Sequence, residues 1–226
     1  MSSENRIPLR DRPFPDYTRS EEMLNMASHL FGVLCAAVMM WLTVRATVGD
    51  PFAMMCGVVY VSSVALMFLM SAIYHGLPRS LPKQVMRVVD HCDIFITIAG
   101  TYTPITLLGI CQVNPALGWS IFAAEWVLAL VGIVLNAIDL KKYARFSMAC
   151  YLGMGWFIIV GLRATVQAMT WAGFLYILGG GVAYTIGAAL YLVGKRRNKR
   201  YRHSLFHLFV VAGALFQFYG ILEYVL

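Results

Sequence analysis

The chain has 226 residues, of which 60% are hydrophobic and 13% are charged, and its formal net charge is +7. A soluble domain carries about 25% charged residues, so this composition excludes an ordinary soluble globular protein. The hydrophobic residues form long uninterrupted blocks, which are typical of segments that cross a lipid bilayer.

The expected organisation is a short tail followed by one membrane domain. Residues 1–22 contain arginines, prolines and acids but no apolar core of the signal-peptide type, so they are interpreted as a cytoplasmic N-terminal tail. Residues 23–226 are interpreted as an all-α bundle of seven transmembrane helices, because each span needs about 20 apolar residues. The expected spans are 24–44, 53–75, 90–109, 118–137, 147–167, 172–193 and 203–224.

The basic residues provide an independent test of this span count. With the N-terminus in the cytoplasm and the C-terminus outside, only Arg45 and Arg163 of the 18 Lys and Arg residues fall in outer segments. That distribution follows the positive-inside rule. We therefore expect a multi-pass membrane protein that is attracted to anionic lipids of the inner leaflet. The net charge needs no nucleic-acid partner to explain it, and the sequence indicates no particular protein partner.

A few polar residues remain at membrane depth, where ionisable groups are costly and are by default functional candidates. Ser71 and His75 lie near the inner end of the second expected span, Asp90 opens the third, and His203 and His207 open the seventh. Residues four apart share one helix face, so His203 and His207 can point at one ion while His75 arrives from another helix. Three neutral histidines and a water would form a four-coordinate zinc site, whose charge Asp90 would partly offset, either directly or through the water.

A lone HxxxH pair can also be hydrated at the membrane surface, and this alternative competes with the zinc site. The convergence of all these residues on one side of the membrane favours zinc. The sequence has no HExxH motif, which excludes a thermolysin-like site.

The cysteines form no CxxC pair and are expected to pack as free thiols. The run of three glycines at 179–181 is expected to permit close helix approach.

Four other positions carry smaller expectations. His91 would point about 100° away from its neighbour Asp90, so packing is expected rather than ligation. For His29 we expect a helix-end histidine bonded to a neighbouring carbonyl. Glu125 is expected to be protonated or paired with a polar group such as Arg163. Pro104 is expected to kink or interrupt the third span.

At these residues the chain resembles the hemolysin III family, the bacterial branch of the progestin and adipoQ receptor superfamily. The resemblance runs from Glu21 to the C-terminus, and Glu125 has no counterpart in the family pattern. The shared motifs are, in chain order, Glu21-Glu22-x-x-Asn25-x-x-x-His29, Ser71-x-x-x-His75, Asp90-His91, Ala99-Gly100-Thr101-Tyr102-Thr103-Pro104, Met154-Gly155-Trp156 and His203-x-x-x-His207-Leu208-Phe209-Val210.

The resemblance implies a seven-helix bundle with a zinc ion near the cytoplasmic face. It also implies that His75, His203 and His207 hold the metal, that Asp90 contacts the zinc-bound water, and that Ser71 lies close to the site. The superfamily is similar to ceramidases in this site, which implies a ceramide-like amide as substrate.

The leading functional hypothesis is a zinc-dependent hydrolase that cleaves an amide or ester bond of a membrane lipid. Asp90 would accept a proton from the attacking water, and Ser71 would orient that water or stabilise the oxyanion. The alternative is a non-enzymatic receptor-like or membrane-homeostasis protein with a structural zinc. A cytolytic pore ranks last, because it needs a polar stripe through several spans whereas the polar residues here gather at one end.

Overall fold

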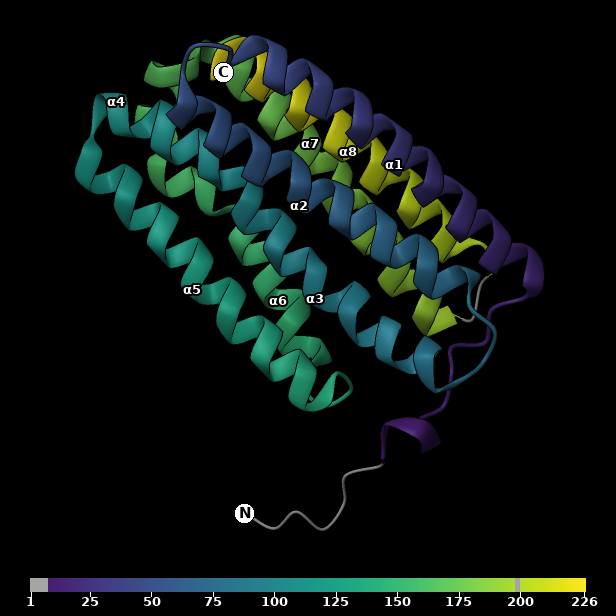
Figure 1. The fold of residues 1–226 in the computed structure, drawn as a ribbon. Coiled ribbons are helices and arrows are strands. Elements are labelled where there is room, and N and C mark those ends of the chain that lie inside the picture. Colours follow the sequence, from purple (N-terminus) through teal and green to yellow (C-terminus); the bar gives the residue numbers. More distant parts are fainter. Residues whose placement is uncertain (1–7, 198–199) are drawn as a thin grey trace.

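The computed structural model describes residues 8–197 and 200–226, except for the side chains of 194–197. The described residues form helices joined by short connections, with no strand among them (Figure 1). Within the described part, 6 helical segments are long and apolar enough to cross a membrane. They are Arg19–Ala46, Pro51–Gly76, Leu81–Val113, Pro115–Asp139, Ala144–Val193 and Arg202–Tyr224. The chain is therefore a polytopic α-helical membrane protein, as its composition predicts.

The first three long helices alternate in direction, so that each is antiparallel to the next, and each begins at a side chain that caps it. At the start of the first helix, Thr18 and Glu21 form a reciprocal capping box. Asp50 accepts from two backbone N–H groups of the second helix, and the Ser80 hydroxyl accepts from one backbone N–H group of the third. These side chains satisfy N–H groups that have no partner within the helix. The three helices are α1 (Arg19–Ala46), α2 (Pro51–Gly76) and α3 (Leu81–Pro104).

The α-helical pattern of the third span ends at Pro104. The next six residues form a π-helical segment, η2 (Ile105–Ile110), followed by the short α4 (Cys111–Val113). Proline has no N–H to donate, and Thr106 donates its hydroxyl to the Tyr102 carbonyl at 2.7 Å beside the break. The predicted interruption at Pro104 is confirmed.

The second half of the chain begins with α5 (Pro115–Asp139) and ends with α8 (Arg202–Tyr224). Between them lies one long helical segment, which consists of α6 (Ala144–Gly155), η3 (Phe157–Gly161) and α7 (Leu162–Arg197). Within α7, Thr170 has non-helical backbone angles, φ 64° and ψ 170°, so the helix is broken there. A positive φ is unusual for a β-branched residue.

Glycines let α7 and α8 approach closely. A Cβ at Gly180 would lie 2.8 Å from the Gly213 carbonyl oxygen, and a Cβ at Gly220 would lie 3.3 Å from the Gly173 carbonyl oxygen. Residues early in α7 thus face the end of α8, and the two helices run antiparallel beyond Thr170. The prediction that the glycine run around Gly180 permits close helix approach is confirmed at that residue.

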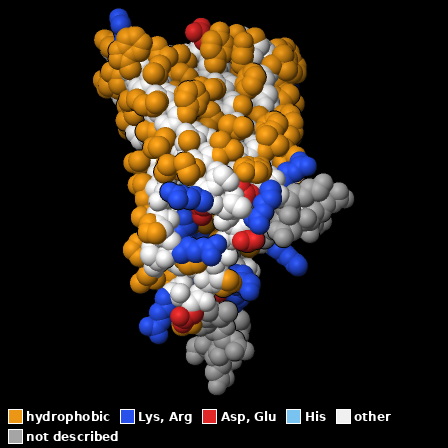
Figure 2. Space-filling model, turned by 90° about the vertical axis from the view of Figure 1, so that its right-hand side faces the viewer, with side chains coloured by type: hydrophobic (Ala, Val, Ile, Leu, Met, Phe, Trp, Pro, Cys, Tyr) orange, Lys and Arg blue, Asp and Glu red, His pale blue; other side chains and the backbone are white. Residues whose placement is uncertain are grey.

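The end of the bundle at which α1, α3 and α8 begin is called here the N-terminal end. In the view of Figure 2, most Lys and Arg side chains gather in the lower part of the molecule, with Asp and Glu among them. Above them the surface is mostly apolar, apart from basic and acidic side chains at the top edge. Leu226 lies at the opposite end, where its side chain approaches Gly57 beside Thr43. Exposed apolar residues such as Leu34, Trp119 and Val127 lie along the sides of the bundle, as lipid contact requires.

Two side-chain expectations can be compared with the structure directly. The five cysteines are all free, as expected. Glu125 is fully buried, and neither of its carboxylate oxygens has a hydrogen-bond partner. Pairing of Glu125 with Arg163 is therefore wrong, since the carboxylate is enclosed within the bundle whereas Arg163 is exposed.

Candidate metal centre

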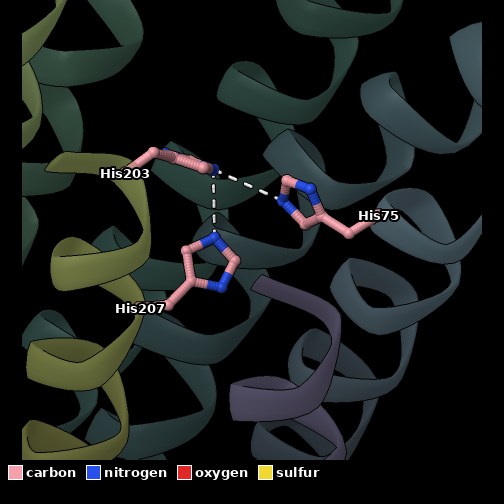
Figure 3. A group of neighbouring side chains, drawn as sticks. All are labelled: His75, His203 and His207. Atoms are coloured by element: carbon pink, nitrogen blue, oxygen red, sulfur yellow. Dashed lines mark hydrogen bonds between the residues drawn. The ribbon is translucent and has the colours of Figure 1, made fainter. Parts of the chain in front are cut away.

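Three histidines from two helices meet at the N-terminal end of the bundle. His75 lies in the last turn of α2, and His203 and His207 lie in the first two turns of α8. The Nε2 atom of His203 is 3.3 Å from Nε2 of His75 and 3.0 Å from Nε2 of His207 (Figure 3). His75 and His207 are buried, whereas His203 is partly exposed.

This geometry fits a metal ion. Ligand nitrogens about 2.0–2.1 Å from zinc at tetrahedral angles are separated by about 3.3–3.4 Å, which is close to the distances between the imidazoles here. A proton on His203 Nε2 could bond only one of the two nitrogens that face it, so a cation satisfies the group better than hydrogen bonds do. Within the described chain, the ligand atoms of His75, His203 and His207 all lie within 4.8 Å of one another, and these residues could hold a metal ion.

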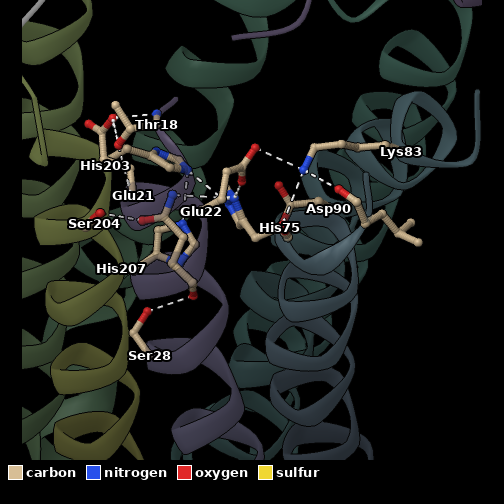
Figure 4. A network of polar contacts seen from close by, with 12 residues as sticks. Thr18, Glu21, Glu22, Ser28, His75, Lys83, Asp90, His203, Ser204 and His207 are labelled. Carbon is tan, nitrogen blue, oxygen red and sulfur yellow. Dashed lines mark hydrogen bonds and ion pairs between the residues drawn. The ribbon is translucent and has the colours of Figure 1, made fainter. Parts of the chain in front are cut away.

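The orientation of His75 is fixed by a carboxylate on α1. Glu22 Oε2 lies 2.6 Å from His75 Nδ1, and Glu22 Oε1 lies 2.9 Å from the Lys83 ammonium. A carboxylate can only accept, so Nδ1 carries the proton and Nε2 presents its lone pair to the site. Lys83 also donates to the carbonyl oxygens of His75 and Leu77, at 3.3 and 2.9 Å. Glu22 and Lys83 thus hold the end of α2 in place (Figure 4).

The start of α8 is fixed by the neighbouring carboxylate. Tyr201, just before α8, has a left-handed backbone with φ 59°, and its N–H donates to Glu21 Oε1 at 2.7 Å. Ser204 donates to Asn25 Oδ1 at 2.5 Å, one turn further into both helices. Because a non-glycine residue adopts positive φ only when its surroundings hold it there, the contact of Glu21 places the first turn of α8 and with it His203.

Asp90 and Ser71 lie one turn deeper than His75. Asp90 is half-buried on α3, where it forms a hydrogen bond with Ser71 and lies 3.5 Å from His91 Nδ1. Figure 4 shows Asp90 beside His75 and Lys83. Asp90 is not one of the residues whose ligand atoms lie within 4.8 Å of one another, so it is not among the candidate ligands.

The two remaining histidines differ in how well the sequence described them. His91 donates from Nδ1 to the Arg87 carbonyl at 2.8 Å and lies outside the metal group, as expected. His29 is buried, and neither ring nitrogen has a hydrogen-bond partner. Its ring centroid lies 3.8 Å from that of His207, so the expected bond to a carbonyl is wrong. The α1–α8 contact buries His29 among rings, where no carbonyl is available.

Sequence reasoning missed Glu21, Glu22, Lys83 and Tyr17 as parts of this site. The available signal was the Glu21-Glu22 pair, which belongs to the family motif but also suits the first turn of any helix. Tyr17 stacks on His203 with ring centroids 5.0 Å apart and an interplanar angle of 11°. Burial raises the pKa of the Tyr17 phenol well above its usual value, so this ring stays uncharged.

The fold and the site define a class: a polytopic helical membrane protein with a triad of histidines at one end of its bundle. A family model described as "Haemolysin-III related" matches residues 17–218. The chain belongs to this hemolysin III family, and the resemblance found in its motifs is confirmed.

Relatives from bacteria and animals align over nearly the whole chain. "Hemolysin-3" of Bacillus cereus is 33% identical over 208 residues, which are 91% of this chain and 92% of that protein. "Hemolysin-3 homolog" of Bacillus subtilis (strain 168) is 30% identical over 210 residues, covering 92% and 96%. "Monocyte to macrophage differentiation factor" of Homo sapiens, a more distant relative, is 25% identical over 235 residues, covering 97% and 90%. The protein is a multi-pass membrane protein, and a bacterial inner membrane is consistent with these relatives.

Proposed function

We propose that this protein binds zinc through His75, His203 and His207 and hydrolyses an amide or ester bond of a membrane lipid. The observation that carries the proposal is the convergence of three histidine Nε2 atoms with separations suited to zinc. Three protein ligands leave one coordination position for a water, which is typical of catalytic rather than structural zinc sites. Zinc bound in such a site supplies a water of lowered pKa and polarises a carbonyl group.

The residues around the triad have separate roles in this proposal. Asp90 accepts the proton of the attacking water and returns it to the leaving group. Ser71, bonded to Asp90, orients the carboxylate or donates to the oxygen on which charge develops. Glu22 keeps His75 in the tautomer that ligates a metal. The substrate class, a ceramide-like lipid amide, rests on the resemblance of the superfamily to ceramidases.

The proposed topology has seven spans, with the N-terminus and the tail of residues 1–22 in the cytoplasm, residues 23–226 as the membrane domain and the C-terminus outside. The 50-residue apolar segment Ala144–Val193 supports two crossings rather than one, because a single span needs about 20 residues. The break at Thr170 lies between the expected spans 147–167 and 172–193. The basic residues at the N-terminal end support a cytoplasmic location for that end and attraction to anionic inner-leaflet lipids.

A structural zinc in a receptor-like or membrane-homeostasis protein is the second candidate. Its support is the polar network that ties α1, α2 and α8 together around the triad, through Glu21, Glu22 and Asn25. In this alternative zinc clamps the helix ends and no bond is broken. A cytolytic pore has less support, because a pore needs a continuous polar lining.

Purified protein incubated with lipid amides, with and without a chelator, separates the two candidates. Asp90→Asn keeps the shape of the side chain and removes its basicity, so the variant should bind zinc supplied in excess and turn over substrate about 10²–10⁴-fold more slowly. Asp50→Asn is the matched control, because Asp50 caps α2 at the opposite end and asparagine caps equally well. A zinc-loaded Asp90→Asn protein with full activity would end the hydrolytic mechanism.

A further inference from the structure

A segment of the N-terminal region crosses the end of the bundle over the histidines. This segment, residues 12–17, is called the strap. Its backbone carbonyls are held from three places: Arg12 O accepts from Gln84 at 2.5 Å, Pro13 O accepts from Arg87 at 3.0 Å, and Asp16 O accepts from Arg200 at 2.7 Å. These donors belong to α3 and to the connection before α8. The strap is therefore bonded to elements on both sides of the site.

The strap places the Tyr17 ring directly on the histidine group. Besides its stack on His203, Tyr17 contacts His75 with ring centroids 5.9 Å apart. The capping box at Thr18 follows immediately and fixes the point at which the chain turns into α1. Tyr17 thus covers one ligand from each of the two helices that supply the triad.

The other sides of the triad are filled by the bundle itself. His207 is covered by His29, whose ring in turn lies 5.2 Å from that of Phe68. His75 has Tyr74 at 4.6 Å between ring centroids and Glu22 at its Nδ1 atom. Of the three histidines, His203 is the partly exposed one, and it is the ring on which Tyr17 lies.

From this geometry we infer that the strap closes the histidine site toward the aqueous phase, and that Tyr17 must leave the face of His203 before a divalent cation or a water-soluble molecule can enter or leave. The inference rests on the proposed metal site. The Tyr17 ring lies flat on the ring of a proposed ligand, so it acts as a cover for the site. Opening the strap breaks the stack and leaves the three histidines to exchange metal with solvent.

The test measures the rate at which zinc-loaded protein in detergent loses zinc to a chromophoric chelator. Tyr17→Ala should lose zinc about 2–12-fold faster than the wild type, because an aromatic pair is worth about 0.5–1.5 kcal/mol. Tyr17→Phe keeps the ring and should behave as the wild type. Arg87→Ala, which frees Pro13, should also accelerate the loss. Tyr143→Ala removes an aromatic ring from the turn between α5 and α6, beside Lys142, and should change nothing. Equal rates for wild type and Tyr17→Ala would overturn the inference.

A second measurement tests the closing role of the strap independently of metal binding. If the wild type binds no zinc, the proposed function fails, and the strap is tested on the metal-free protein by the rate at which diethyl pyrocarbonate modifies His203, followed by mass spectrometry. Faster modification in Tyr17→Ala than in Tyr17→Phe supports the closing role. Equal modification in both variants contradicts it.

Discussion

Replacing Glu22 by glutamine tests whether the carboxylate on α1 prepares His75 for a metal. The wild-type carboxylate accepts from His75 Nδ1 at 2.6 Å with one oxygen and from Lys83 at 2.9 Å with the other. Glutamine has only one oxygen. If that oxygen faces Lys83, the amide N–H₂ faces Nδ1 and favours the tautomer whose Nε2 carries the proton and cannot ligate. If it faces His75, the amide N–H₂ faces the buried Lys83 ammonium, which in either arrangement loses its counter-charge.

Either arrangement weakens the site, and the magnitude follows from the hydrogen bonds that Glu22 makes. Loss of a partner that orients a metal-bound histidine typically lowers metal affinity about 10–100-fold, or about 1.4–2.8 kcal/mol. Lys83 keeps two carbonyl acceptors, so we expect the metal-free protein to lose only about 1–3 kcal/mol of stability. Competition titration against a chromophoric chelator measures the affinity, and thermal unfolding of the metal-free protein measures the stability.

Two further variants test the contacts assigned to Glu22. In Glu22→Gln combined with Lys83→Met no ammonium is left unpaired and the amide oxygen is free to accept from His75 Nδ1, so stability and zinc affinity should both recover in part. Glu223→Gln makes the same change at an exposed position near the end of α8, and it should leave affinity unchanged. Wild-type zinc affinity in a folded Glu22→Gln protein would refute the assignment of Glu22.

Three other predictions follow from the same structure. His75→Ala leaves two protein ligands, so zinc occupancy measured by elemental analysis should fall sharply, and full occupancy would place the metal elsewhere. A reporter fused after Leu226 should lie outside the cytoplasm, and a reporter inserted at Asn198, which lies outside the described residues, should lie in the cytoplasm. Two reporters on the same side of the membrane would contradict seven spans. Gly180→Ala puts a Cβ 2.8 Å from the Gly213 carbonyl oxygen, so thermal unfolding should show a loss of about 1–3 kcal/mol of stability. An unchanged melting temperature would mean that the two helices can move apart without cost at this contact.

The sequence predicted the parts of this molecule that depend on local spacing. Apolar runs of span length predicted the long helices, and the four-residue spacing of His203 and His207 put both rings on one face of α8. Asp90 and Ser71 fell at one depth because α2 and α3 are antiparallel and joined by a short turn. These features can be predicted from helix geometry and from the side of the membrane on which each span begins.

Other features depend on contacts between distant segments and could not be read from local pattern. Glu21 bonds to Tyr201, and Glu22 to His75 and Lys83, across helices that only the folded bundle brings together. An acid in the first turn of a helix is common, so the sequence alone does not single out these two. Span lengths predicted a connection between residues 167 and 172, but Thr170 itself carries no strong helix-breaking signal of the kind that Gly or Pro would give.

The basic segment before α8 shows the same limit. The sequence predicts that neutralising Arg196, Arg197, Lys199 and Arg200 affects insertion but not metal content, since none of the four can ligate zinc. The side chains of Arg196, Arg197 and Lys199 lie outside the described part of the chain. Arg200, however, donates to Asp16 and lies 3.4 Å from Glu21, so its loss should loosen both the strap and the start of α8.

X-ray absorption at the zinc edge of the purified protein tests the central claim most directly. The account predicts one zinc per chain with three histidine nitrogens and one oxygen at about 2.0–2.1 Å, and a loss of imidazole scattering in His203→Ala. Protein purified with zinc in excess that holds no stoichiometric zinc, or zinc whose nearest neighbours include sulfur at about 2.3 Å, would contradict it.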